Sequence, residues 1–121
     1  MKIAVSATGP QPTDEVDPRF GRAPWFLIYD TETRASQPVS NQENVSSTHG
    51  AGVQTAQSMA RLGVAGVITG HVGPKAYQVL SAANVRVYRG DARRVEEAVR
   101  VFERGQLREL TEANGPEGFG G

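Results

Sequence analysis

Thr69-Gly70-His71-Val72-Gly73-Pro74-Lys75 is the stretch around which the rest of the chain can be arranged. It follows the apolar run 65–68 and precedes a segment whose apolar residues recur at helical spacing, so it predicts a turn from a strand into a helix. Pro74 suits the first helical position, where its missing N–H loses no hydrogen bond. Gly70 and Gly73 permit positive φ and the close approach of another group to the backbone.

The chemistry of this turn suits an anion. The first N–H groups of a helix have no partner inside the helix and lie at the positive end of its dipole. Thr69 ends the strand, His71 is expected at the rim of the turn, and Lys75 is expected in the first helical turn. Two interpretations stay open, a pocket for an anion or metal cluster and an ordinary tight loop with a solvated histidine.

Composition narrows the classes of function. The chain has 121 residues, with 13 basic and 13 acidic side chains and a formal net charge of zero. This length suits one domain, and this charge argues against bulk binding to nucleic acid or to a membrane surface. There is no cysteine, which excludes disulfides, thiolate zinc sites and all-cysteine iron–sulfur sites. We expect a cytoplasmic protein, because no segment has the pattern of a signal peptide or a membrane span.

Hydrophobic patterns predict five strands and three helices in the order β-β-β-α-β-α-β-α. The strands are expected at 2–6, 25–30, 35–40, 65–69 and 85–89, and the helices from about 49 to Gly63, over 74–83 and over about 92–104. Pro38 predicts that the strand at 35–40 lies at an edge of the sheet. Ser47 or Thr48 could cap the start of the first helix, and Asp91 could cap the start of the last. Residues 1–105 would form the domain, and residues 106–121 a flexible Gly/Glu-rich tail.

These elements predict an α/β domain of three layers, α/β/α. Right-handed crossovers would give a mixed five-stranded sheet with helices on both faces. The first strand would be central, with the opening hairpin on one side and the later strands on the other. The gap between the first and fourth strands is then a switch point, where ligands of open α/β sheets bind. The loop 7–23, the helix start 49–52 and the turn 69–75 would meet there.

Candidate binding residues fall on these three segments, namely Arg19, Arg22, His49, Gly50, Gly52, Thr69, Gly70, His71, Gly73 and Lys75. His49 and His71 are candidate metal ligands, since neutral imidazole binds transition metals, but they could also be two exposed loop histidines. Arg19, Arg22 and Lys75 could neutralise an anionic ligand. The two arginines could instead pair with the acidic residues of their own loop, which are Asp14, Glu15 and Asp17.

Four segments, in this order and spacing, resemble a known family. They are Asp17-Pro18-Arg19-Phe20-Gly21-Arg22, then Asn44 with His49-Gly50-Ala51-Gly52, then Thr69 to Ala76, and then Val87-Tyr88-Arg89-Gly90 with Val95-Glu96-Glu97-Ala98. The family is the dinitrogenase iron–molybdenum cofactor biosynthesis family, small carrier proteins of the nitrogenase accessory factor type. The resemblance covers roughly residues 1–104, although relatives often have Asn where this chain has His71. It implies a ribonuclease-H-like fold, which agrees with the layered layout.

The resemblance implies a non-catalytic carrier or sensor of a small anionic metal–sulfur cluster or its precursor, because some members bind iron–molybdenum–sulfur or molybdenum–copper–sulfur clusters. Cluster-delivery or assembly proteins would be its partners, with no nucleic acid and no membrane. The alternative is a small enzyme or regulatory module that binds a phosphorylated metabolite or nucleotide at the same helix starts. Enzyme chemistry is not expected, since the first strand lacks a nuclease carboxylate and no Ser-His-Asp, Walker or dinucleotide motif occurs.

Overall fold

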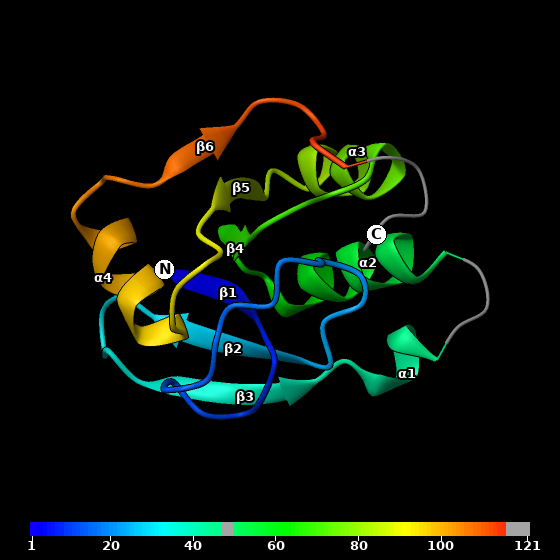
Figure 1. Ribbon diagram of the computed structural model, residues 1–121. Helices are drawn as coiled ribbons and strands as arrows, with labels where there is room; N and C mark the ends of the chain where they lie inside the picture. The colour runs from blue at the N-terminus through cyan, green and yellow to red at the C-terminus, as the bar shows by residue number, and fades with distance from the viewer. Residues whose placement is uncertain (47–49, 116–121) are drawn as a thin grey trace.

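A computed structural model describes residues 1–46 and 50–115 as a mixed six-stranded sheet with helices against both faces (Figure 1). The elements are β1 Lys2–Ala7, β2 Trp25–Asp30, β3 Ser36–Ser40, α1 Gln42–Val45, α2 Ala51–Leu62, β4 Gly66–Thr69, α3 Pro74–Ala82, β5 Arg86–Arg89, α4 Val95–Glu103 and β6 Arg108–Leu110. Within these described ranges, no helix is long and apolar enough to cross a membrane.

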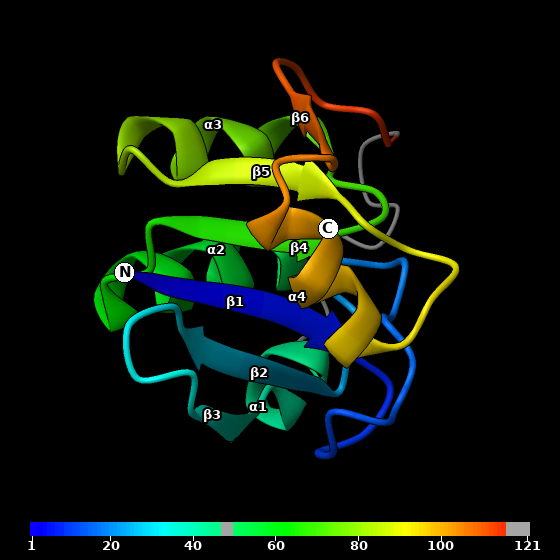
Figure 2. The ribbon, with the colours of Figure 1, turned by 90° about the vertical axis from the view of Figure 1, so that its left-hand side faces the viewer.

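The strand order is β3-β2-β1-β4-β5-β6. β1 runs parallel to β4, and β4 runs parallel to β5, whereas the β1–β2, β2–β3 and β5–β6 pairs are antiparallel. The central place of β1, the hairpin beside it and the edge position of β3 with its Pro38 are therefore confirmed. The carboxyl ends of β1, β4 and β5 lie at one edge of the sheet, and the predicted switch point lies between β1 and β4 (Figure 2).

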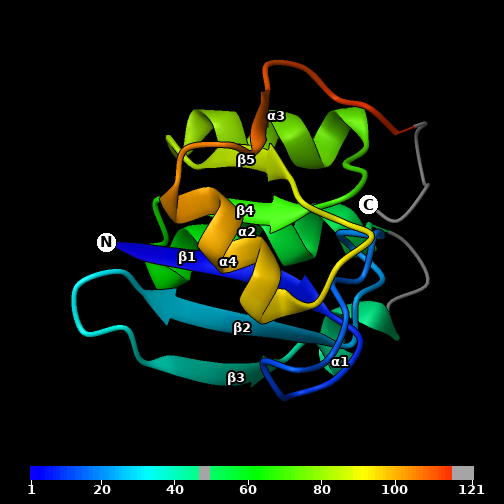
Figure 3. The same ribbon diagram turned by 60° about the vertical axis from the view of Figure 1, so that its left-hand side comes forward.

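The sheet separates two apolar cores. Helices α2 and α3 cover one face and α4 covers the other, which gives three layers (Figures 2 and 3). Alternation along β1 places Ala4 in the core beneath α2 and α3, and Ile3 and Val5 in the core beneath α4. All three side chains are at most 1% exposed, so β1 is the buried centre of the domain.

Two helix ends follow the sequence signals, and one does not. Pro74 occupies the first turn of α3, and Gly63 ends α2 in the left-handed conformation with φ 71°. Asp91 does not cap α4, because Ala92 has φ 66° and the helix begins only at Val95. The proposed caps of α2, Ser47 and Thr48, lie outside the described residues.

A sixth strand corrects the expectation of five. β6 pairs with β5 in antiparallel register and places Leu110, 8% exposed, opposite Val87. The Tyr77 hydroxyl donates to the Leu110 carbonyl at 3.1 Å. Residues 108–110 thus pack on the sheet instead of belonging to a flexible tail from residue 106, while 116–121 lie outside the described residues.

Candidate functional site

The floor of the switch point is a buried pair of hydroxyls. Ser6, on β1, and Thr69, at the end of β4, are both 0% exposed, and their hydroxyl oxygens lie 2.8 Å apart. The Ser6 oxygen also lies 2.7 Å from the Asp17 carbonyl, and the Asp17 N–H donates to the Ser6 carbonyl at 2.9 Å. The long loop after β1 is therefore fastened to the end of β1, whose Ser6 hydroxyl in turn contacts Thr69 at the end of β4.

The same loop pairs with the turn after β4 through main-chain hydrogen bonds. The His71 N–H donates to the Pro18 carbonyl at 2.7 Å, and the Phe20 N–H donates to the His71 carbonyl at 3.2 Å. Gly70 makes this approach possible, because a Cβ there would lie 2.7 Å from both Cα and O of Pro18. Two of the segments that resemble the family thus form one structural unit.

Phe20 fixes this unit to the core. Its side chain is 0% exposed and contacts Phe26 edge to face, with ring centroids 5.6 Å apart. Phe26 lies on β2, so the loop is held by apolar packing as well as by backbone pairing. Phe20 is therefore a buried anchor of the long loop.

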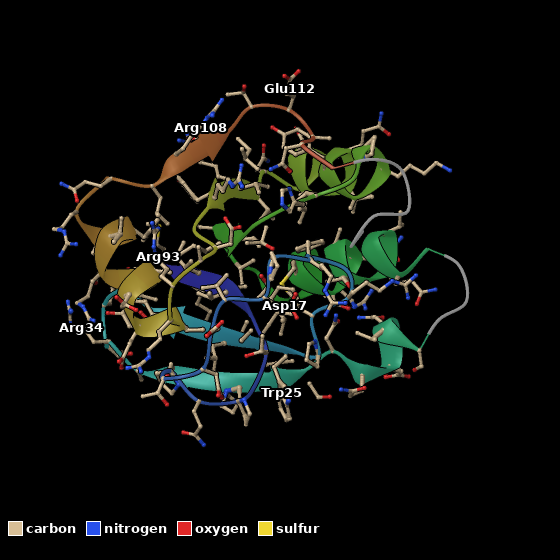
Figure 4. The ribbon with its side chains drawn as sticks, viewed as in Figure 1. Asp17, Trp25, Arg34, Arg93, Arg108 and Glu112 are labelled. Carbon is tan, nitrogen blue, oxygen red and sulfur yellow. The ribbon has the colours of Figure 1, made fainter. Side chains whose placement is uncertain are left out.

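Asp17, labelled in Figure 4, forms an ion pair with Arg19 of the same loop. The Asp17 carboxylate, whose side chain is 3% exposed, accepts hydrogen bonds from the Arg19 N–H at 2.9 Å and from its guanidinium at 3.2 Å. These contacts raise the pKa of Arg19, first through the hydrogen bond and then through the charge of Asp17. For Arg19, the pairing within the loop is therefore present, while about half of its side chain remains exposed.

The remaining candidates lie on the long loop, at the start of α2 and at the turn after β4. Arg22 donates to the Val45 carbonyl at 3.2 Å and ties the loop to α1. Gly50 is the residue before α2, with φ 71°, and Gly52 is buried in the first turn of that helix. At the turn after β4, Gly73 is buried, His71 is half-buried and Lys75 is exposed.

The structure tests only part of the proposed metal site. His49 lies outside the described residues, so the predicted pairing of His49 with His71 remains a prediction. Among the residues that the structure describes, no group of three or more His, Cys, Asp or Glu side chains could hold a metal ion. Ligation by protein side chains alone therefore has little support in the described part of the chain.

Asn114 is a contact residue of the turn that the sequence analysis missed. Its side-chain oxygen accepts from the Val72 N–H at 2.9 Å, and its side-chain nitrogen donates to the Gly70 carbonyl at 2.8 Å. The backbone N–H groups of Asn114 and Gly115 both point to the Val72 carbonyl, at 3.2 and 3.0 Å. The Val72 N–H thus donates within the protein and is not an open anion donor. No local pattern indicates this role, since the segment is polar and has no regular period.

Replacing Asn114 by alanine should destabilise the domain by about 1–2 kcal/mol, because the Val72 N–H and the Gly70 carbonyl each lose a partner. Glu112, exposed in the same segment (Figure 4), provides the control, since Glu112→Ala removes none of these bonds. Urea unfolding of both variants measures the difference. Equal stability of the two variants would contradict a structural role for the Asn114 side chain.

Comparisons with known proteins agree with this arrangement. Residues 1–105 match the family model of the dinitrogenase iron–molybdenum cofactor. The apo form of the orange protein from Desulfovibrio gigas is 41% identical, with a TM-score of 0.91 over 94% of this chain and 96% of that one. A NifB-like protein from Thermotoga is 37% identical, with a TM-score of 0.82 over 94% and 97% of the two chains. An uncharacterized protein of Methanocaldococcus jannaschii is 31% identical over 112 residues, 88% of this chain and 89% of that protein.

Proposed function

Since the chain belongs to the dinitrogenase iron–molybdenum cofactor family, we propose that it carries a small anionic metal–sulfur cluster, or a precursor of one, as cargo. In this proposal the protein binds and hands over the cargo without catalysing a reaction. Cluster-delivery or assembly proteins would be its partners, and the ribonuclease-H-like comparison remains a prediction of the family resemblance. The orange protein, whose structure is that of an apo form, is the neighbour that best fits a carrier.

The observation that carries the proposal is the positive character of the switch point. The first turns of α2 and α3 contain no acidic residue, so no carboxylate there offsets the positive ends of these helices. Helix α2 leads into β4, and helix α3 follows β4. Since β4 runs parallel to β1, both helices begin at the side of the sheet where β1 and β4 end. Arg22 and Lys75 add positive charge at this edge, whereas the charge of Arg19 is offset by its ion pair with Asp17.

The chain's residues could hold such a cargo without thiolate ligands. The N–H group of Ala76, in the first turn of α3, has no partner inside the helix and can donate to a sulfide or oxo group of a cluster. Guanidinium and ammonium groups contribute charge-assisted hydrogen bonds, which are stronger than neutral ones. His71 could add one metal bond, and the loop–turn unit would present these groups in fixed positions.

Reconstitution tests the proposal. Incubation with iron, molybdate and sulfide should give a coloured protein that retains metal after desalting. Lys75→Gln should lower the loading, because it removes a positive charge beside the cargo. Lys2→Gln is the matched control, since Lys2 begins β1 at the opposite edge of the sheet. Protons compete with metal for imidazole, so loading that depends on His71 should fall as the pH is lowered and should lose that dependence in His71→Ala.

Two outcomes would contradict the proposal. Equal metal loading of the Lys75 and Lys2 variants would show that the cargo does not bind beside Lys75, where β1 and β4 end. A protein that stays colourless, while a nucleotide or sugar phosphate raises its melting temperature, would favour the alternative of a module that binds a phosphorylated metabolite.

A further inference from the structure

A second positively charged feature lies beyond the switch point, where β5 ends. It is a hollow of about 340 Å³ between the loop that enters α4 and the segment that enters β6. Its lining consists of Arg89, Asp91, Arg93, Gln106, Leu107 and Arg108. Figure 4 shows that Arg93 comes from the loop before α4 and that Arg108 comes from β6, so distant parts of the sequence supply the charges.

Two of these arginines are held opposite each other. Arg89 of β5 and Arg108 of β6 are register partners in the antiparallel ladder. Like charges at directly opposed positions destabilise a sheet, and both residues are exposed, so burial of their side chains offers little compensation. An anion placed between the two guanidinium groups would convert this repulsion into attraction.

The hollow contains more positive than negative charge. Asp91 accepts a hydrogen bond from Arg89 Nε at 3.1 Å and is the one acidic residue of the lining. Within residues 1–46 and 50–115, the side chains of Arg93 and Arg108 make no hydrogen bond or ion pair. Three guanidinium groups and one carboxylate leave an excess of two positive charges, which matches a dianion.

The backbone on one side of the hollow is fixed. The Arg93 carbonyl accepts from the Val16 N–H at 2.9 Å, and the Gly90 N–H donates to the Thr69 carbonyl at 2.9 Å. A Cβ on Gly90 would lie 2.5 Å from Ile68 Cγ2, so the strand end packs closely on β4. The start of the arginine-bearing loop is therefore positioned by the same strand and the same long loop that build the switch point.

We propose that this hollow is a binding site for a tetrahedral dianionic oxyanion, either a phosphate group or a free anion such as molybdate. Guanidinium forks match two oxygens of such an anion, and Arg93 and Arg108 are available to donate. The site lies apart from Arg19, His71 and Lys75, and it requires no metal–sulfur cluster. Its test is therefore independent of the cargo proposal.

Titration calorimetry at low ionic strength, with the full chain, tests the site. The probes are inorganic phosphate, molybdate and glycerol phosphate, with chloride as the monovalent reference. Arg108→Gln and Arg93→Gln should each weaken phosphate binding by roughly tenfold, since each removes a charge-assisted hydrogen bond. Arg61→Gln is the matched control, because Arg61 lies on α2 and takes no part in the lining. If glycerol phosphate binds more tightly than both free anions, the ligand is a phosphorylated metabolite. If phosphate or molybdate binds more tightly than glycerol phosphate, the ligand is a free oxyanion.

Asp91→Asn gives an effect in the opposite direction. It removes the competing carboxylate and releases Arg89, so phosphate should bind several-fold more tightly than to the parent chain. Arg108→Gln should also raise the melting temperature without phosphate, because the repulsion with Arg89 disappears, and it should lessen the further rise that phosphate produces. A merely solvated group of arginines would show neither the tighter phosphate binding of Asp91→Asn nor a phosphate-dependent rise in melting temperature that Arg108→Gln lessens.

The proposal is overturned if phosphate binds no more tightly than chloride. It is also overturned if the Arg93 and Arg108 variants bind phosphate as well as the Arg61 control does. Circular dichroism of each variant confirms that it is folded before these comparisons are made.

Discussion

Replacing Gly70 by alanine is expected to lower the free energy of unfolding by about 3 kcal/mol, through overpacking and the loss of a backbone hydrogen bond. The added methyl group would lie 2.7 Å from the Pro18 backbone, which cannot move away as a flexible side chain could. Relief of this clash would separate the loop from the turn and break the 2.7 Å bond between the His71 N–H and the Pro18 carbonyl. Urea denaturation measures the loss, and cluster loading should fall with it.

Gly105→Ala is the control for this substitution. Gly105 has φ 70°, which an L-residue adopts at a penalty of about 1–2 kcal/mol, but a Cβ there would meet nothing within 4 Å. The comparison separates steric overlap from backbone strain, since Gly70 is not among the described glycines with positive φ. A Gly70 variant as stable as the Gly105 variant would show that the loop and turn do not need this close approach.

Ending the chain after Gly105 should also destabilise the domain, by about 3 kcal/mol. This truncation removes β6, uncovers the apolar surface that Leu110 covers, and deletes the acceptor of the Tyr77 hydroxyl. It also removes Asn114 from the turn after β4. The sequence-based expectation of a flexible tail over residues 106–121 would instead make this truncation nearly neutral.

A chain that ends at Gly115 is the matched control, because it keeps β6 and every one of these contacts. The chain ending at Gly105 should melt several degrees below this control. If the two truncated chains have the same melting temperature, the pairing of β6 with β5 contributes nothing measurable to stability.

The elements that sequence predicts well are those whose signals are local. The alternating or continuous apolar runs of β1, β2 and β4 identify these strands, and Pro74 and Gly63 mark two helix ends. The central place of β1 also follows from its composition, because a strand without charged residues after Lys2 is suited to burial on both faces.

The elements that sequence misses depend on contacts between distant residues. β6 contains one buried apolar residue, Leu110, and exists because β5 offers a partner strand. The start of α4 shifts because Asp91 pairs with Arg89 and Ala92 adopts positive φ, neither of which a capping preference can anticipate.

The candidate site likewise has features that the sequence predicts and features that it misses. The meeting of loop 7–23 with turn 69–75 follows from the strand order, and the structure brings Arg19 and His71 into adjacent positions. The sequence left open whether the arginines face a ligand or the loop's own carboxylates, because that choice depends on where Asp17 is buried. It gave no indication of Asn114, whose side-chain oxygen accepts a hydrogen bond from the Val72 N–H in the turn before α3.

The two edges of the sheet bear on how the protein behaves at high concentration. An edge strand with a long row of unpaired N–H and C=O groups invites edge-to-edge association and aggregation. Here one edge is β3, where Pro38 removes a donor, and the other is β6, which has three residues, two of them charged. Both edges are therefore poor templates for an added strand, so we expect little edge-to-edge association of the domain in a crowded solution.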